Sequence, residues 1–560
     1  MVYVGLIKIV EQLSPNSIEN LNNLAATNYN LGNVREAMAD QKKILKLDPD
    51  FKHAFNNLGA CYVHLGNFDK AIEFFKKAVS LARSNWTNIY FPFRYKLLTE
   101  EVSLSEVEDI FISDESIIDR VSVMELILRL SVGTNDCERM HRRLCKVIEQ
   151  DMSLSLSNPA GTTSKKGDAQ RSTNLISLVH FGRSGSGFLH ALIDNHPDVV
   201  TLPSIYFSEY FDRRTWEYIS RDGWSGLVEN FVSYYDVLFD SRSSVPVMSK
   251  ASKQIHSIGV KEGLTVLGKN KNDFLELDRT KFAETLSTLI SKEAEISPAT
   301  FFELVHLAFD EVVNGLPSEK TIFYHIHNPD CFSFAHFIHS FPEGKLLMIV
   351  RDPLQSCESW AEKADDNYLK ICQRIIQMLV DINHYSYQLL NSKGIRLEDL
   401  KKIPDQALDR LSNWMGINYS DSLTEMTMMG KKWWGDPASP DYKSEGMKPF
   451  GQKSILRPPS NYFDHNDRAI LKTLFYPFSV RFGYTESDEV NFQKDLNKLP
   501  ELLDGLFSFE KQHINNKKIT EVELRNNGHF KYFRAELLHR YTILKKNGTY
   551  PNMLEPLIIK

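Results

Sequence analysis

The sequence predicts an all-α array of helical repeats followed by an α/β domain built on a parallel sheet. The first observation is a 34-residue period near the N-terminus. The second is a change, after residue 174, to short apolar strands that alternate with helices, as in a parallel sheet covered by helices. The third is a glycine-rich, P-loop-like segment between one such strand and the helix that follows it.

Composition and charge exclude several classes of protein. The chain has 560 residues, 42% of them hydrophobic and 25% charged, with a formal net charge of −6. These are values of an ordinary globular protein, so a disordered, collagen-like or disulfide-scaffold chain is excluded. A protein that binds nucleic-acid phosphates normally has more Lys and Arg than Asp and Glu, so we expect no nucleic-acid partner. The six cysteines form no C-x-x-C pair, so we expect no metal site. No uninterrupted apolar run reaches 18 residues, so we expect no membrane span and a cytoplasmic location.

The repeat signal consists of four pairs of identical residues, each pair 34 positions apart. These pairs are Pro15 and Pro49, Leu24 and Leu58, Gly32 and Gly66, and Ala37 and Ala71. The period resembles that of the tetratricopeptide repeat, which implies stacked helix pairs that bind a protein or peptide partner. The predicted order is tetratricopeptide repeats over 1–84, a helical cap or connector over 85–152, a linker over 153–173, the α/β domain over 174–485 and a helical C-terminal extension over 486–560.

The strongest chemical signal is the segment from Phe181 to Leu189, Phe-Gly-Arg-Ser-Gly-Ser-Gly-Phe-Leu. Backbone N–H groups of a glycine-rich turn at a helix N-terminus favour an anion. Gly182 and Gly187 have the spacing of a nucleotide-triphosphate loop, but Phe188 stands where that motif has Lys. The segment therefore predicts a phosphate site without the equipment for Mg²⁺ and a triphosphate, and Arg183 supplies the cation.

A second segment follows the predicted strand 345–350. Arg351 ends this strand, and Ser359 lies eight residues later in the helix that starts near Pro353. An arginine at the carboxyl end of a strand can bind a phosphate through two hydrogen bonds, and a serine hydroxyl can add another donor.

Together the two segments resemble the sulfotransferase family that uses 3′-phosphoadenosine 5′-phosphosulfate, over residues 175 to 484. The resemblance implies a parallel-sheet sulfotransferase domain with two sets of cofactor-binding residues. They are Arg183, Ser184, Gly185, Ser186, Gly187 and Phe188 for the 5′-phosphosulfate, and Arg351 and Ser359 for the 3′-phosphate. The chain departs from the family in two places, since Gly187 lacks the hydroxyl of a second Thr and Leu397 stands where a Tyr often lies near the adenosine.

The catalytic base is predicted from the segment Tyr324-His-Ile-His-Asn-Pro329. It resembles the Lys-Thr-His-x-Pro segment of cytosolic sulfotransferases, which implies His327 as the base, with His325 beside it and Arg183 as the electrostatic catalyst. Residues two apart on a strand share a face, and an imidazole suits proton removal at neutral pH. A strand-end histidine pair that only bonds the backbone is the structural alternative. Protein-tyrosine sulfotransferases use a Glu after the loop instead, which makes Glu209 the runner-up.

The predicted function is sulfuryl transfer to a hydroxyl or amine acceptor, with the repeats binding a partner or the acceptor. A carbohydrate, a protein tyrosine and a small molecule all stay open as acceptors. The alternative is a repeat-based scaffold with an inactive or kinase-like nucleotide-binding domain. The serine-rich linker suggests two loosely tied halves, so we expect a chain starting near Ser172 to keep nucleotide binding.

Overall fold

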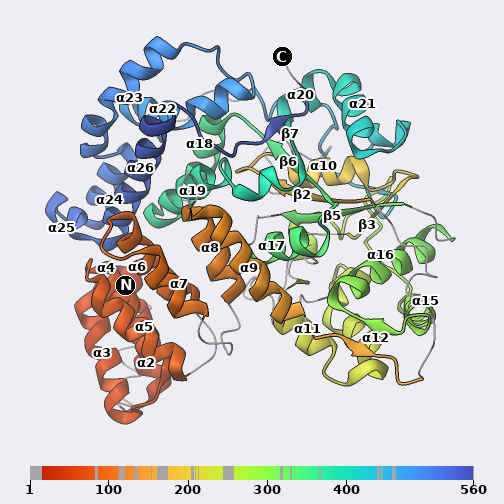
Figure 1. Ribbon diagram of the computed structural model, residues 1–560, viewed down its shortest axis with the longest axis horizontal. Coiled ribbons are helices and arrows are strands. Elements are labelled where there is room, and N and C mark those ends of the chain that lie inside the picture. Colours follow the sequence, from red (N-terminus) through yellow and green to blue (C-terminus); the bar gives the residue numbers. More distant parts are fainter. Residues whose placement is uncertain are drawn as a thin grey trace.

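The computed structural model describes the chain apart from a set of excluded segments, which are residues 1–15, 82–85, 113–119, 132–135, 153, 161–173, 204–206, 208–209, 212, 244–257, 316–319, 328–330, 365–366, 438–441, 443–445, 457–461 and 559–560. The backbone alone is described at residues 86–90, 110–112, 120, 122–123, 126, 151–152, 258, 261, 327 and 331–333. Figure 1 shows the repeat helices at one end, the sheet at the other and the C-terminal helices beside both. In the described part of the chain, no helix is long and apolar enough to cross a membrane.

Two helix pairs form the N-terminal repeats. They are α2 (Ile18–Leu31), α3 (Val34–Leu47), α4 (Lys52–His64) and α5 (Phe68–Leu81). Gly32 and Gly66 follow the first helix of each pair with φ values of 87° and 68°, a left-handed conformation that glycine adopts without steric cost. Gly59 lets α4 lie against α5, because a Cβ there would be 2.6 Å from Cδ1 of Phe75. The helix turns therefore lie where the 34-residue pattern places them.

Further helices extend the hydrophobic core of the second repeat. They are α6 (Trp86–Leu98), α7 (Leu104–Ile112), α8 (Arg120–Ser131) and α9 (Cys137–Met152). Phe68 and Phe75 of the repeat share one buried cluster with Met124 of α8 and Met140 of α9. These helices thus cover the apolar end that the repeats would otherwise expose.

A parallel sheet lies at the centre of the α/β domain (Figure 1). Its described strands are β2 (Leu175–His180), β3 (Val199–Thr201), β5 (Thr321–His327), β6 (Lys345–Val350), β7 (Asn391–Arg396) and β10 (Glu555–Pro556). Their order is β10-β7-β6-β2-β5-β3, with every neighbouring pair parallel. β2 is buried at every residue, which explains its nearly continuous apolar sequence. The segments that follow β2, β5, β6 and β7 therefore meet at one edge of the sheet.

Helices cover both faces of the sheet. Ile176 and Leu178 of β2 pack on one face with α10 (Ser186–Ile193), α20 (Leu397–Lys402) and α21 (Pro404–Met415). Leu175 and Val179 pack on the other face with α16 (Pro298–Asn314), α17 (Cys331–Ser340), α18 (Pro353–Lys363) and α19 (Tyr368–Asp381). Successive residues of a strand point to opposite faces, so one strand serves both cores. The predicted repeat array followed by a parallel-sheet α/β domain is confirmed.

The remaining elements surround this frame. They are α11 (Arg213–Ile219), α12 (Gly223–Tyr234), α13 (Asp236–Phe239), α14 (Ile258–Lys261), α15 (Arg279–Ser291), η3 (Tyr385–Gln388), η4 (Asp421–Thr424), β8 (Thr427–Met428) and β9 (Lys431–Lys432). β8 and β9 form a short antiparallel pair outside the main sheet.

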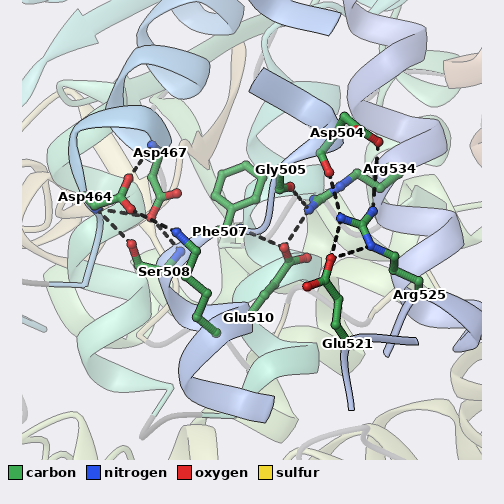
Figure 2. A network of polar contacts seen from close by, with 11 residues as sticks. Asp464, Asp467, Asp504, Gly505, Phe507, Ser508, Glu510, Glu521, Arg525 and Arg534 are labelled. Atoms are coloured by element: carbon green, nitrogen blue, oxygen red, sulfur yellow. Dashed lines mark hydrogen bonds and ion pairs between the residues drawn. The ribbon is translucent and has the colours of Figure 1, made fainter. Parts of the chain in front are cut away.

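The C-terminal part of the chain packs on the α/β domain and completes its sheet. Its elements are α22 (His465–Arg481), α23 (Glu489–Asp504), α24 (Ser508–Lys517), α25 (Glu521–Asn526), α26 (Gly528–Asn547) and the edge strand β10. Figure 2 shows the polar contacts that tie these helices together: Ser508 N donates to Asp467 Oδ2 at 3.0 Å, and Arg534 donates to Gly505 O at 2.8 Å and to Glu510 Oε2 at 2.6 Å. The expected extension thus includes a strand as well as helices.

The repeats dock on this C-terminal part through close backbone contact and a buried ion pair. Gly528 at the start of α26 lies against Val63 of α4, since a Cβ at Gly528 would be 1.9 Å from the Val63 carbonyl oxygen. Arg94 of α6 forms an ion pair with Glu536 of α26, with Nη2 3.0 Å from Oε2, and both side chains are buried.

A second buried charge cluster joins α8 to α19 and the turn after it. Arg129 donates to Glu125 and to Asp381, at 2.8 Å in each case, and His384 Nε2 lies 2.6 Å from Glu125 Oε1. The expectation of two loosely tied halves is therefore wrong. Buried ion pairs connect the N-terminal helices to the rest of the chain. The composition of the linker does not reveal such contacts.

The predicted linker over 153–173 is wrong in its first part. Residues Leu156–Ser157 form β1, which pairs antiparallel with β4 (Glu295–Ile296). This pairing depends on a partner about 140 residues away, so local composition does not reveal it. Residues 161–173 of the predicted linker lie outside the described residues.

Candidate functional site

The glycine-rich loop connects the carboxyl end of β2 to the N-terminus of α10. Gly182 has a φ of 61° and Gly185 a φ of 90°, so both positions suit glycine alone. Gly185 is the N-cap of α10 and makes no side-chain cap hydrogen bond. The first backbone N–H groups of α10 therefore have no capping side chain, and with the helix dipole they favour an anion.

The hydroxyl of Ser184 turns into the protein and ties the loop to β6. Ser184 Oγ donates to Ile349 O at 2.7 Å and accepts from Phe181 N at 3.3 Å, and the side chain is completely buried. Ser184 was predicted to bind the donor, but its hydroxyl fixes the shape of the loop.

The other loop residues predicted to bind the donor differ in their surroundings. Ser186 begins α10 and is buried. Gly187 lies beside Trp433, whose Cη2 would be 3.9 Å from a Cβ at this position. Phe188 packs in the core below α10, with Lys401 Nζ 3.7 Å from its ring centroid. Phe188 thus anchors the helix, and a ligand would meet the backbone there.

Arg183, the loop cation, extends toward α18. Its guanidinium carbon lies 5.7 Å from the ring centroid of Trp360, and Trp360 directly follows the predicted binding residue Ser359. The two motifs, which are about 170 residues apart in sequence, are therefore brought together at the end of β2 and β6.

Arg351 lies in the second motif at the carboxyl end of β6. It is buried, and its Nη2 donates to Gln355 Oε1 at 3.1 Å and to Ser454 O. Asp352 caps α18 by accepting from Gln355 N at 2.8 Å, which fixes the backbone between Arg351 and the helix. Ser359 is buried two turns further along α18.

Sequence reasoning missed the segment 446–456, which crosses this edge of the sheet. Met447 N donates to Trp434 O at 2.8 Å, Lys401 Nζ donates to Pro449 O at 2.5 Å, and Ser454 O accepts from Arg351. Ser454 Oγ is buried without a hydrogen-bond partner among the described residues. A buried hydroxyl next to a buried arginine is a further donor for an anion. Two glycines and two lysines in this segment are a weak signal that could have drawn attention to it.

Residues after β7 hold the end of β6 in place. Leu397 packs on the loop, with Cδ1 3.3 Å from the position of a Cβ at Gly185. Glu398 accepts from Asp352 N at 3.2 Å and from Tyr484 OH at 3.0 Å, and burial raises its pKa. Glu398 thus supports the second motif from the segment after the neighbouring strand β7.

The structure describes the surroundings of His325, but not those of the two candidate bases His327 and Glu209. His325 is buried in β5, and its Nδ1 lies 3.2 Å from Nδ1 of His190 in α10, while burial lowers the pKa of His190. His325 thus contacts α10, and its place beside the catalytic base stays a prediction. His327 ends β5 at the same edge as the loop, but its side chain lies outside the described residues, as does Glu209.

No metal cluster is found in the described parts of the chain: they contain no group of three His, Cys, Asp or Glu side chains that could hold an ion.

Comparisons with known proteins identify the repeats. Residues 18–51 and 54–85 each match a family model described as a tetratricopeptide repeat. The N-terminal helix pairs are tetratricopeptide repeats. No curated protein sequence matches the chain. Among solved structures, the chain is similar to a sulfotransferase domain from the Synechococcus PCC 7002 olefin synthase, at 13% identity and a TM-score of 0.32, covering 56% of this chain and 98% of that one.

A second solved structure, a sulfotransferase domain from the curacin biosynthetic pathway, matches at 14% identity and a TM-score of 0.26, covering 59% of this chain and 99% of that one. These low scores carry no weight for the chemistry below, which rests on the residues of the site. The tetratricopeptide repeats end well before the loop, so the loop and the Arg351 motif both belong to the α/β domain.

Proposed function

We propose that this protein is a sulfotransferase that moves a sulfuryl group from 3′-phosphoadenosine 5′-phosphosulfate to a hydroxyl or amine acceptor. The single observation that supports the proposal is the meeting of the glycine-rich loop and the Arg351 motif at adjacent strand ends. The contact between Arg183 and Trp360 joins them. A donor with two separate anionic groups needs two such sites side by side.

The residues present fit this donor. The hydroxyl of Ser454, which has no hydrogen-bond partner among the described residues, lies beside Arg351 on one side of the site, and the N-terminus of α10, without a capping side chain, lies on the other. Both features suit an anion. When bound, the donor supplies a sulfuryl group: its sulfur–oxygen bond to the phosphate breaks, and a new bond forms from sulfur to the acceptor oxygen or nitrogen. Adenosine 3′,5′-bisphosphate leaves, and the acceptor gives up its proton to a base.

The chain's own residues have distinct roles in this proposal. Arg183 and the first N–H groups of α10 neutralise charge that develops on the leaving phosphate oxygen, an electrostatic contribution to catalysis. Arg351, Ser359 and Ser454 hold the 3′-phosphate and so fix the donor's register. His327 at the end of β5 accepts the acceptor proton, with Glu209 as the runner-up base. The repeats bind a protein partner or the acceptor, and the cytoplasmic location and lack of nucleic-acid binding stay predictions from sequence.

Nucleotide selectivity tests the proposal. We expect calorimetry to show tighter binding of adenosine 3′,5′-bisphosphate than of ATP, with no Mg²⁺ added. The scaffold alternative with a kinase-like domain requires a different result, tighter binding of ATP that depends on Mg²⁺. Transfer of labelled sulfate from the donor to an acceptor in a cell extract would then distinguish an active enzyme from an inactive nucleotide-binding domain.

A further inference from the structure

Two arginines face the same indole ring beside the loop. The guanidinium carbon of Arg183 lies 5.7 Å from the ring centroid of Trp360, and that of Arg374 in α19 lies 4.2 Å from it. The two guanidinium groups are therefore no more than about 10 Å apart. Like charges this close repel each other unless an anion lies near them.

None of the described carboxylates forms an ion pair with Arg374. Its Nη1 donates to the side-chain amide oxygen of Gln377 at 2.5 Å, and no carboxylate of the described residues lies within ion-pair distance of it. The carboxylate whose charge acts on it, Asp381, is bonded to Arg129. Arg374 is half-buried, so part of its guanidinium is shielded from water without an ion-pair partner, an arrangement that favours an external anion.

Arg374 lies on a helix that contacts the glycine-rich loop. Met378, one turn further along α19, packs against the loop, with Sδ 3.2 Å from the position of a Cβ at Gly182. α19 therefore runs alongside the loop. Arg374 lies one turn before Met378 and packs against the ring of Trp360. No group of α19 is needed for the donor, because the loop and the Arg351 motif account for both of its anionic groups.

We propose that Arg374, held by Trp360, binds an anionic group of the acceptor. The acceptor is then a molecule that carries a carboxylate, phosphate or sulfate group close to the hydroxyl or amine that is modified. A guanidinium that lies over an aromatic ring keeps its N–H edge open for two parallel hydrogen bonds to such a group. This inference rests on the proposed sulfotransferase function and adds to it the charge of the substrate.

The test uses two phenols of nearly the same size and shape, the anionic 4-hydroxybenzoate and the neutral 4-hydroxybenzamide. Each is titrated into the full-length protein saturated with adenosine 3′,5′-bisphosphate, and the affinity is measured by calorimetry. We expect the benzoate to bind at least about tenfold more tightly than the benzamide, as one charge-assisted pair provides. The variant Arg374→Gln should abolish this difference, and Arg374→Lys should restore part of it.

Lys370→Gln is the matched control, because it removes an exposed positive charge from the same helix one turn earlier. It should keep the preference for the benzoate. Equal binding of the two phenols by the native protein, or an unchanged preference in Arg374→Gln, would overturn the inference. So would a loss of adenosine 3′,5′-bisphosphate binding in Arg374→Gln, because Arg374 would then serve the donor. Failure of the native protein to bind this nucleotide at all would instead contradict the proposed function.

Discussion

The hydroxyl of Ser184 donates a hydrogen bond to the carbonyl oxygen of Ile349, 2.7 Å away, and so fastens the anion loop to the neighbouring strand β6. The loop after β2 and the end of β6 are thereby held in register by the protein itself. Ser184 and Ser186, two apart in the same motif, consequently have separable roles.

Replacing these two serines should separate stability from affinity. Ser184→Ala removes one hydrogen bond each from the Ile349 carbonyl and the Phe181 N–H, which stay bonded to each other at 3.1 Å, so the free energy of unfolding should fall by about 0.5–1.5 kcal/mol. Ser186→Ala should lower the free energy of unfolding by less than Ser184→Ala does, while weakening the binding of adenosine 3′,5′-bisphosphate. Urea denaturation and calorimetry measure the two quantities. A larger loss of stability in Ser186→Ala would contradict this assignment.

Arg351 should dominate the affinity for the 3′-phosphate. Arg351→Ala removes charge-assisted hydrogen bonds, so binding of adenosine 3′,5′-bisphosphate should weaken about 10- to 150-fold. Arg410→Ala, which removes an exposed arginine of α21, is the control and should bind normally. Comparison with adenosine 5′-phosphate in the same assay isolates the 3′-phosphate: the variant should bind this smaller nucleotide as the native protein does.

The base can be assigned by kinetics. His327→Ala should lower turnover by about 10²- to 10⁴-fold with nearly unchanged nucleotide affinity, since a base acts on the acceptor proton. Steady-state rates and nucleotide binding are measured on the same preparations. Full activity in His327→Ala together with inactivity in Glu209→Ala would move the role to the carboxylate.

The docked repeats should be needed for the stability of the whole chain. Arg94→Met leaves the buried Glu536 with only the more distant Arg540 as an ion-pair partner, at 3.9 Å, which should cost up to about 3–5 kcal/mol. The double variant Arg94→Met/Glu536→Met should recover only part of that loss, because it leaves the buried Arg540 without Glu536. Chemical denaturation followed by circular dichroism measures both.

A chain starting near Ser172, expected from sequence to bind nucleotide, would lack Arg94 and Arg129 and should be destabilised. Unchanged stability in Arg94→Met would show that the ion pair does not hold the repeats in place.

The same ion pair predicts sensitivity to acid. Arg94 and Arg540 hold the pKa of Glu536 at about 2, below its ordinary value of 4.5. The folded state therefore binds this proton less readily than the unfolded chain does. The resulting stability is fully present above pH 4.5 and is lost as the pH falls toward 2. In Glu536→Gln the free energy of unfolding should change less with pH over this window, as measured by denaturation at a series of pH values. An equally steep dependence in the variant would assign the acid sensitivity to other groups.

The sequence predicts those parts of the molecule that local patterns determine. Equal spacing of Gly32 and Gly66 predicts the repeats, and the apolar run before Gly182 predicts β2 and the loop at its carboxyl end. Arg351 lies at the end of β6, as its position after an apolar strand indicates.

Contacts between distant segments could not be predicted in this way. Ser454 reaches Arg351 from about 100 residues away, and His190 covers His325 from another element. The inward turn of Ser184 depends on the carbonyl of Ile349, which belongs to a strand far along the chain. Such pairings follow from the packing of whole elements, and no short sequence pattern encodes them.

The position of β10 at the edge of the sheet has a consequence for synthesis on the ribosome. Glu555 and Pro556 of β10 pair with β7. The end of α4 packs against Gly528 of α26, which is also synthesised late. The repeats are made first, but their docking surface is made more than 400 residues later. At about 5–20 residues per second, tens of seconds pass between synthesis of the repeats and synthesis of the C-terminal helices and β10. During this interval a chaperone or another protein can bind the repeats before they dock.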